Sequence, residues 1–170
     1  PAAAHRNKNN MTVRNLEFLF HPRSVAVVAE PAEQGCYADV VLRNLAAGGF
    51  AGTVTPVAAK KHSLFGIGTH VHLSQLAAAP DLAVVCAPLR DVAGIVAELG
   101  KRGTRAVIVG PSLREKLGEA QVAAARKAIL DAARPKLVRV LGPGSGGLVV
   151  PSGRLNASVA PVMAGRGKIA

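Results

Sequence analysis

Short apolar runs alternate along the chain with longer segments whose apolar residues recur at helical spacing. The runs are rich in valine, as in SVAVV and LAVVCA, and such runs are typical of buried strands. They predict strands at Ser24–Val28, Thr53–Val57, Leu82–Ala87, Arg105–Val109 and Leu137–Leu141, with a further apolar stretch at Leu148–Val150. The segments between them predict helices at Asp39–Ala47, Asp91–Lys101 and Glu115–Ala133, and a short helix at Leu73–Ala78.

Strands separated by helical segments of this length favour right-handed crossovers and a parallel sheet. The sequence therefore predicts an α/β fold, a Rossmann-like open and mostly parallel sheet with helices on both faces. Pro56 indicates a strand end, because proline cannot donate to the hydrogen-bond ladder. Ligands of such sheets bind at the carboxyl ends of the strands. This edge corresponds to the loops that start near Ala29, Ala58, Ala87, Gly110 and Gly142.

The composition fits a buried sheet covered by helices. Of the 170 residues, 49% are hydrophobic but only 3% are aromatic, so the core is built from small aliphatic side chains. No apolar run approaches the ~20 residues that a transmembrane helix needs, and the first residues lack the apolar centre of a signal peptide. We therefore expect a soluble, cytoplasmic domain with no membrane partner.

The charge narrows the class of ligand. The net charge is +11, and the segment from Arg134 to the end holds six basic residues and no acidic ones. A basic surface attracts polyanions, either nucleic acid or a phosphorylated cofactor. Nucleic-acid binders often add aromatic stacking residues, and the single tyrosine and four phenylalanines are not in basic clusters, which disfavours nucleic acid.

The sequence offers no catalytic or metal-binding pattern. Its five histidines are scattered, and two cysteines do not make a disulfide framework. Cys86 lies in an apolar run and is expected to be a buried small side chain, whereas Cys36 follows the first strand and is expected to be a plain cysteine. Ser145 lacks a nucleophile's context, so we interpret Gly142 to Gly147 as a glycine-rich turn that can also line a ligand site.

Several segments, in order, resemble one family. FLFHPRSVAVV, VVLRNLAAGGF, TVTPVAAK, PDLAVVCAP, RGTRAVIV, ILDAARPKLVRVLGP and LNAS are similar to the CoA-binding domain of the ADP-forming acyl-CoA synthetases. That domain is related to the succinyl-CoA synthetase α-subunit, and it also occurs at the N-terminus of GNAT-fused bacterial protein acetyltransferases. The likeness extends from about Leu16 to Ala170. The final GRGKIA resembles the entry to the family's next domain.

The resemblance implies a ligand and a division of the chain. CoA or acyl-CoA is expected across the strand ends, with its phosphates at the loop from Ala29 to Tyr37. Residues 1–14 are expected to be a flexible tail, 15–160 the CoA-binding domain, and 161–170 a linker toward downstream domains of the same protein. The family's phosphohistidine segment and ATP-grasp domain lie outside these segments. We therefore expect no complete active site in this chain, and self-association into a homo-oligomer is an open possibility.

The resemblance also implies the residues that bind the cofactor. They are Ala29, Glu30, Pro31, Gly35, Lys60, Ala87, Pro88, Gly142 and Gly144. Gly35, Lys60 and Pro88 match the family's pattern, and Lys60 is placed to meet a phosphate, with Lys61 beside it.

Other positions depart from that pattern. Ala29 replaces a glycine, and Pro31 replaces a serine, which removes a hydroxyl and an N–H donor. Glu30 and Glu33 add negative charge where phosphates are expected.

The remaining departures lie in the other loops of the same edge. Ala58 and Ala59 replace Asn-Pro, Ala87 replaces a threonine, and Gly144 and Ser145 replace Asn-Cys. Two hypotheses follow: a CoA-binding domain that relies on backbone contacts, or a diverged regulatory or interaction domain that has lost CoA.

Overall fold

The centre of the fold is a five-stranded parallel sheet. The computed structural model describes residues 14–29, 36–58, 63–64, 66–111, 115–165 and 167. The sheet has the order β2-β1-β5-β6-β7, and each neighbouring pair runs parallel. Its strands are β1 (Ser24–Ala29), β2 (Thr53–Ala58), β5 (Leu82–Cys86), β6 (Ala106–Val109) and β7 (Arg139–Leu141). The predicted α/β class with a parallel sheet is confirmed.

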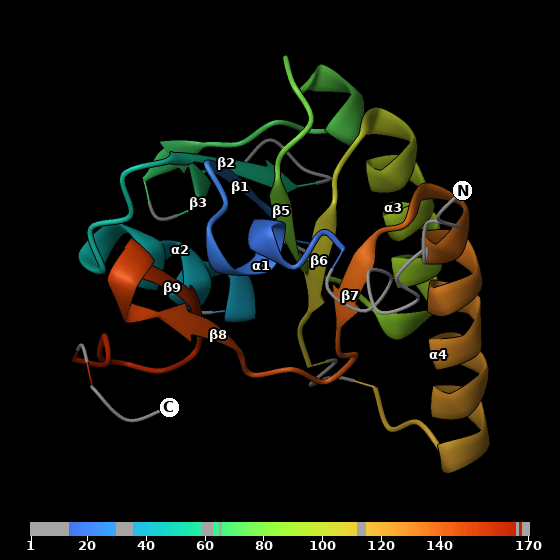
Figure 1. Ribbon diagram of the computed structural model, residues 1–170. Coiled ribbons are helices and arrows are strands. Elements are labelled where there is room, and N and C mark those ends of the chain that lie inside the picture. Colours follow the sequence, from blue (N-terminus) through green and yellow to red (C-terminus); the bar gives the residue numbers. More distant parts are fainter. Residues whose placement is uncertain are drawn as a thin grey trace, which may run out of the picture.

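Helices cover both faces of this sheet (Figure 1). On one face lies α2 (Tyr37–Ala47), and on the other lie α3 (Leu89–Arg102) and α4 (Glu119–Ala133). The chain leaves β1 through α2 toward β2, and it leaves β5 through α3 toward β6. Because the two crossovers run in opposite directions with the same hand, their helices must lie on opposite faces.

The alternation of side chains along β1 creates two cores. Val25, Val27 and Ala29 pack against α2, whereas Ala26 and Val28 pack on the face of α3 and α4. All five are almost completely buried. A strand that is buried on both faces reads as a continuous apolar run, which explains why SVAVV was recognisable in the sequence.

The α2 face is completed by two elements from the ends of the described chain. The short helix α1 (Glu17–Phe20) buries Leu19 there. The antiparallel ribbon of β8 (Gly147–Val150) and β9 (Leu155–Ser158) packs beside α2, and Leu155 and Ala157 are fully buried (Figure 1). The sequence did not predict α1 or β9.

Smaller elements complete the outline. The two-residue strands β3 (Ser63–Leu64) and β4 (Ile67–Gly68) form a hairpin. Single 3₁₀ turns are η2 (Leu73–Gln75), η3 (Arg134–Lys136) and η4 (Pro151–Gly153). The predicted helix at Leu73–Ala78 is therefore only one 3₁₀ turn.

Pro56 lies inside β2, two residues before the strand ends, rather than at the end itself. The N–H of Thr53 donates to the Arg23 carbonyl on the β1 side, whereas the Pro56 carbonyl faces outward and accepts from the N–H of His70 (3.1 Å). Since N–H and C=O of one strand residue point the same way, the donor that proline lacks would also have faced outward. A proline is tolerated here because β2 is an edge strand.

Two predicted boundaries move for local reasons. Helix α4 begins at Glu119 rather than Glu115, because Gly118 is extended (φ −74°, ψ 161°) and precedes the first turn. Strand β7 begins at Arg139 rather than Leu137, because Leu137 ends η3 in the left-handed region (φ 55°). Across the described ranges, the structure contains no helix whose length and apolar character would let it cross a membrane.

Candidate functional site

The carboxyl ends of all five parallel strands meet at one edge of the sheet. The chain turns away from β1 in one direction and from β5 in the other, so the topological switch point lies between these two neighbouring strands. Open α/β sheets bind their ligands outside the strand ends at such a point. The candidate site therefore lies between the loop after β1 and the turn after β5.

The start of α2 forms one side of this point. Cys36 is the N-cap residue, is extended, and gives the helix no side-chain cap. Ala29, the last residue of β1, is fully buried between Ala58 and Cys86, so its side chain belongs to the core. Asp39 lies in the first turn of α2 and is 7% exposed. Its carboxylate lowers the positive potential that a helix N-terminus otherwise offers to an anion.

The start of α3 forms the other side, and the chain's own carboxylate occupies it. Pro88 is the N-cap residue and provides no side-chain cap. Instead, the N–H of Leu89 donates to Oε2 of Glu115 (2.7 Å), and Nη1 of Arg90 contacts Oε1 (3.1 Å). The predicted residues Ala87 and Pro88 both lie at this turn and are partly buried. The start of α3 is thus capped by an anionic group from within the protein.

The glycine-rich loop after β7 returns over the end of β6. The N–H of Ser145 donates to the Val109 carbonyl (3.1 Å), and the N–H of Gly144 to the Gly110 carbonyl (3.4 Å). Gly142 has a φ of +104°, and a Cβ there would lie 2.4 Å from the Val109 oxygen, so only glycine fits. The Ser145 hydroxyl accepts from the Gly147 N–H (3.1 Å) and stabilises the turn. The predicted turn is confirmed.

The two predicted glycines of this loop differ in surroundings. Gly142 is fixed against β6 by the close approach just described. Gly144 also has positive φ (+83°), but apart from its chain neighbours no described residue has an atom within 4 Å of the position of a Cβ. Gly144 is exposed, so its backbone is accessible from solvent.

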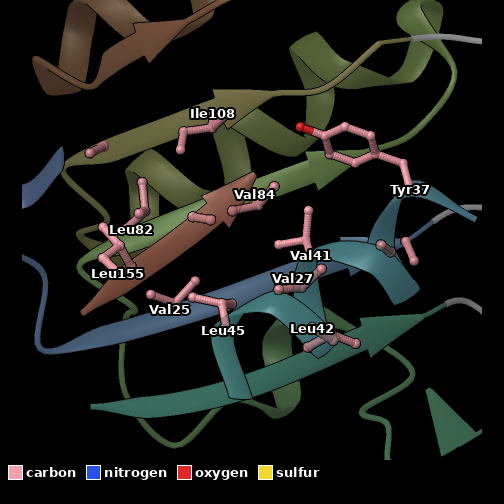
Figure 2. Close-up of a cluster of buried hydrophobic side chains, with 14 of the residues drawn as sticks. Val25, Val27, Tyr37, Val41, Leu42, Leu45, Leu82, Val84, Ile108 and Leu155 are labelled. Carbon is pink, nitrogen blue, oxygen red and sulfur yellow. The ribbon is translucent and has the colours of Figure 1, made fainter. Parts of the chain in front are cut away.

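Tyr37 joins α2 to this loop. Its hydroxyl donates to the Ser145 carbonyl (3.1 Å), and its ring lies directly on Gly110, where a Cβ would come within 2.8 Å of the ring. Figure 2 shows the ring lying toward the carboxyl ends of β5 and β6, at the border of the buried cluster. Burial, followed by the thiol of Cys86, raises the pKa of Tyr37. The phenol is therefore neutral and able to donate.

The two cysteines lie at this edge as well. Cys36 precedes α2, Cys86 ends β5, and both are partly buried and pack against the α2-face core. Burial, followed by the neighbouring Cys36, raises the pKa of the Cys86 thiol. The protonated thiol of Cys86 acts as the small apolar side chain that the sequence predicted.

The structure brings together part of the predicted set. Ala29, Ala87, Pro88, Gly142 and Gly144 all lie at or beside the carboxyl edge. The predicted Glu30, Pro31, Gly35 and Lys60 lie outside the described residues, as do Glu33 and Lys61. In the ranges that are described, no three His, Cys, Asp or Glu side chains gather as a metal site.

Sequence reasoning missed two contacts of this edge. Tyr37 was only the end point of the predicted loop, and Glu115 was placed inside a helix. Two features of the sequence could have indicated the contact of Tyr37 with Gly110. Tyr37 is an isolated aromatic residue just before a predicted helix, and Gly110 is a glycine that follows the fourth predicted strand. No local pattern indicated that Glu115 would cap α3.

Comparisons with known proteins agree with this geometry. The family model described as "CoA binding domain" matches residues 23–151. The α-subunit of acetate–CoA ligase (ADP-forming) I from Pyrococcus furiosus is 31% identical over 151 residues, which cover 86% of this chain and 32% of that protein. The acetate–CoA ligase (ADP-forming) of Methanocaldococcus jannaschii is 25% identical over 154 residues, covering 91% of this chain and 21% of that protein.

A solved structure shows the same fold. The dinucleotide-forming acetyl-coenzyme A synthetase 1 of Ca. Korarchaeum cryptofilum, in complex with phosphate and ADP, superposes with a TM-score of 0.75 at 29% identity. The superposition covers 86% of this chain and 31% of that one. The chain thus spans about a third or less of these relatives. Because the family model covers most of the described sheet, from just before β1 to the end of β8, this chain belongs to the CoA-binding domain family.

Proposed function

We propose that this domain binds CoA or acyl-CoA at the carboxyl edge, between the loop after β1 and the turn after β5. The observation that carries the proposal is the switch point between β1 and β5, which lies within the segment matched by the CoA-binding family. The start of α2, where the side chain of the N-cap residue Cys36 forms no capping hydrogen bond, is the proposed place for a phosphate. The start of α3 is less suitable, because Glu115 already occupies it.

The wider role follows from the relatives. They are ADP-forming acetate–CoA ligases, so we propose that this domain serves as the nucleotide-binding part of an acyl-CoA synthetase of that type, rather than of an acetyltransferase. Downstream domains of the same protein are its proposed partners, and the cytoplasm is its proposed location. We expect no acyl-CoA synthesis from this chain alone.

A second candidate is a regulatory or interaction domain that has lost CoA. It is favoured by the buried Asp39 in the first turn of α2 and by Glu30 and Glu33, which precede that helix in the sequence. These carboxylates oppose the phosphates of CoA. The two candidates differ in one measurable quantity, the affinity of the chain for CoA.

Isothermal titration calorimetry with CoA and acetyl-CoA tests the proposal. We expect micromolar binding by the 170-residue chain. Lys60→Ala should weaken that binding roughly tenfold, because we propose that this lysine contacts a phosphate of CoA. Lys101→Ala is the matched control, because Lys101 lies in the last turn of α3, at the opposite edge of the sheet. Absence of binding at millimolar CoA would favour the second candidate. Equal losses in the two variants would argue for a general charge effect rather than a site.

A further inference from the structure

Tyr37 links the start of α2 to the glycine-rich loop after β7 at the carboxyl edge. We propose that Tyr37 positions the Gly142–Gly147 loop as a wall of the CoA site, by joining that loop to the start of α2 across Gly110. The inference rests on the function proposed above. Tyr37 is a positioning residue in this proposal, because its hydroxyl donates its hydrogen bond to the backbone carbonyl of Ser145.

The ring and the hydroxyl have separate partners. The ring lies on Gly110, where a Cβ would meet Cε1 at 2.8 Å and Cδ1 at 3.1 Å, so even alanine would displace it. The hydroxyl extends beyond Gly110 to the Ser145 carbonyl (3.1 Å). Tyr37 as a whole is 9% exposed, and its hydrogen bond to the partly buried Ser145 lies at the border of the core. A phenol suits the position because it combines an apolar ring with a polar end.

The loop already has a fixed place relative to β6. Backbone bonds from Ser145 to Val109 and from Gly144 to Gly110 hold it there, and Gly142 packs on the Val109 carbonyl. These contacts do not involve α2. Among the described residues, the Tyr37 hydroxyl provides the side-chain hydrogen bond between the start of α2 and this loop.

The hydrogen bond from Tyr37 affects the proposed ligand site because Tyr37 lies at the start of α2. Tyr37 is the first residue of α2 and directly follows the N-cap residue Cys36. The phosphate is proposed to bind at this helix start. A shift of the loop relative to α2 would therefore change the distance between the phosphate position and the exposed backbone of Gly144.

A competing interpretation treats Tyr37 as a core side chain only. Its ring does pack against the α2-face cluster, at the border visible in Figure 2. The two interpretations differ in the role of the hydroxyl. If only packing matters, phenylalanine should replace tyrosine without effect on the ligand.

The test is Tyr37→Phe, which keeps the ring on Gly110 and removes the bond to Ser145. We expect the dissociation constant for CoA, measured by calorimetry, to rise roughly two- to tenfold, the effect of one hydrogen bond. Hydrogen–deuterium exchange should increase in the peptide that covers 142–147, while peptides from β1 and β5 keep their protection. This local pattern separates a positioning role from a general loss of stability.

Asn15→Gly provides the matched control. Asn15 also donates from its side chain to a distant backbone carbonyl, that of Leu137 (2.7 Å), but at the amino end of β7. Its φ of 63° suits glycine, so the variant removes the bond without backbone strain. We expect lower stability and unchanged CoA affinity.

A second variant acts on the same contact from the other side. Gly110→Ala keeps the hydroxyl but pushes the ring away, and it should weaken CoA binding at least as much as Tyr37→Phe. Wild-type affinity in both variants would overturn this inference alone. Failure of the wild-type chain to bind CoA would overturn the proposed function and this inference together.

Discussion

Tyr37 is the single tyrosine of the chain, and the chain has no tryptophan. Its near-ultraviolet absorbance therefore reports on one place, the contact of α2 with Gly110 and Ser145. A buried phenol that donates to a carbonyl is stabilised in its neutral form. Ionisation of Tyr37 is thus coupled to the opening of this contact.

We predict that Tyr37 ionises well above the pH at which an unfolded tyrosine does, about 10. Burial and the thiol of Cys86 raise its pKa. A group whose pKa is raised in the folded state contributes its full stability below the unfolded pKa and loses it as the pH rises toward the folded one. Alkaline absorbance titration should show a phenolate midpoint above that of the same chain in urea, and unfolding free energy should decline from about pH 10 upward.

Tyr37→Phe is the control for this titration, since it should lack the absorbance change and show a weaker alkaline decline of stability. Coincident midpoints in buffer and in urea would contradict the assigned burial of the phenol.

Single residues also show the limits of prediction from sequence. Cys86 was expected to be a buried small side chain; it packs against the α2-face core, as its apolar neighbours in the chain indicated, but at the end of β5 it is only partly buried. Ala29 was predicted as a cofactor-binding residue; its side chain is fully buried at the end of β1, and its contact with a ligand stays a prediction. Position along a strand indicates which loop is near, but the direction of each side chain depends on the faces of the folded sheet.

At the scale of elements, the start of α3 beside the switch point is capped by a carboxylate from a distant part of the chain. The start of α3 is capped by Glu115, whose side chain is 16% exposed and also contacts Arg90. At the start of α2, the side chain of the N-cap residue Cys36 forms no capping hydrogen bond, and the acidic residue of the first turn is Asp39. The capping carboxylate stabilises α3 and adds a negative charge to the edge where CoA is proposed to bind.

Glu115→Gln should therefore separate stability from binding. The amide oxygen still accepts from the Leu89 N–H, but the negative charge that interacts with the helix dipole and with Arg90 is lost. Because the Arg90 side chain is largely exposed, its ion pair contributes little to stability. We expect the unfolding free energy to fall by about 0.5–1 kcal/mol. Affinity for CoA should stay the same or rise, since a negative charge leaves the edge; urea denaturation and calorimetry measure the two quantities.

Asp131→Asn is the charge-matched control, because Asp131 lies on the exposed side of α4 and pairs with Lys127 and Arg134. CoA affinity should be unaffected in that variant. A loss of affinity in Glu115→Gln would show that the carboxylate supports the ligand site rather than opposing the ligand.

Elements with strong periodicity were predictable and others were not. Strands β1, β5 and β6 are valine-rich runs buried on both faces, and their predicted bounds fall within one residue of the observed ones. Strand β9 has the sequence LNAS, with one large apolar residue, and its burial arises from packing beside α2. The start of α4 was missed because the apolar pattern of that segment continues through the extended Gly118.

At the scale of the molecule, the α2-face core depends on residues beyond the segment that the family model matches. That match ends at residue 151, whereas Leu155 and Ala157 of β9 are fully buried. The buried side chain of Asn44 donates to the carbonyls of Ser158 (2.8 Å) and Ala160 (2.9 Å). The folded unit therefore extends past the matched segment.

A chain that ends at residue 151 should consequently be far less stable. The shorter chain lacks the buried Leu155, exposes the sheet residues that β9 covers, and leaves the Asn44 amide without its two carbonyl acceptors. We expect the free energy of unfolding to fall by at least about 4 kcal/mol. Urea denaturation and binding of a hydrophobic dye measure the effect. A chain that ends at Met163 keeps all these contacts and is the control. Equal stability of the two chains would contradict the role given to β9.

The proline in the outer strand β2 also limits how copies of this domain can associate. At Pro56 there is no donor, its carbonyl already accepts from His70, and the N–H of Ala58 is taken by the His70 carbonyl (2.8 Å). A second sheet that approached this edge would find no continuous ladder to join, and such interruptions protect edge strands from intermolecular pairing. Association of two copies through a continuous ladder along β2, including amyloid-like stacking there, is therefore disfavoured.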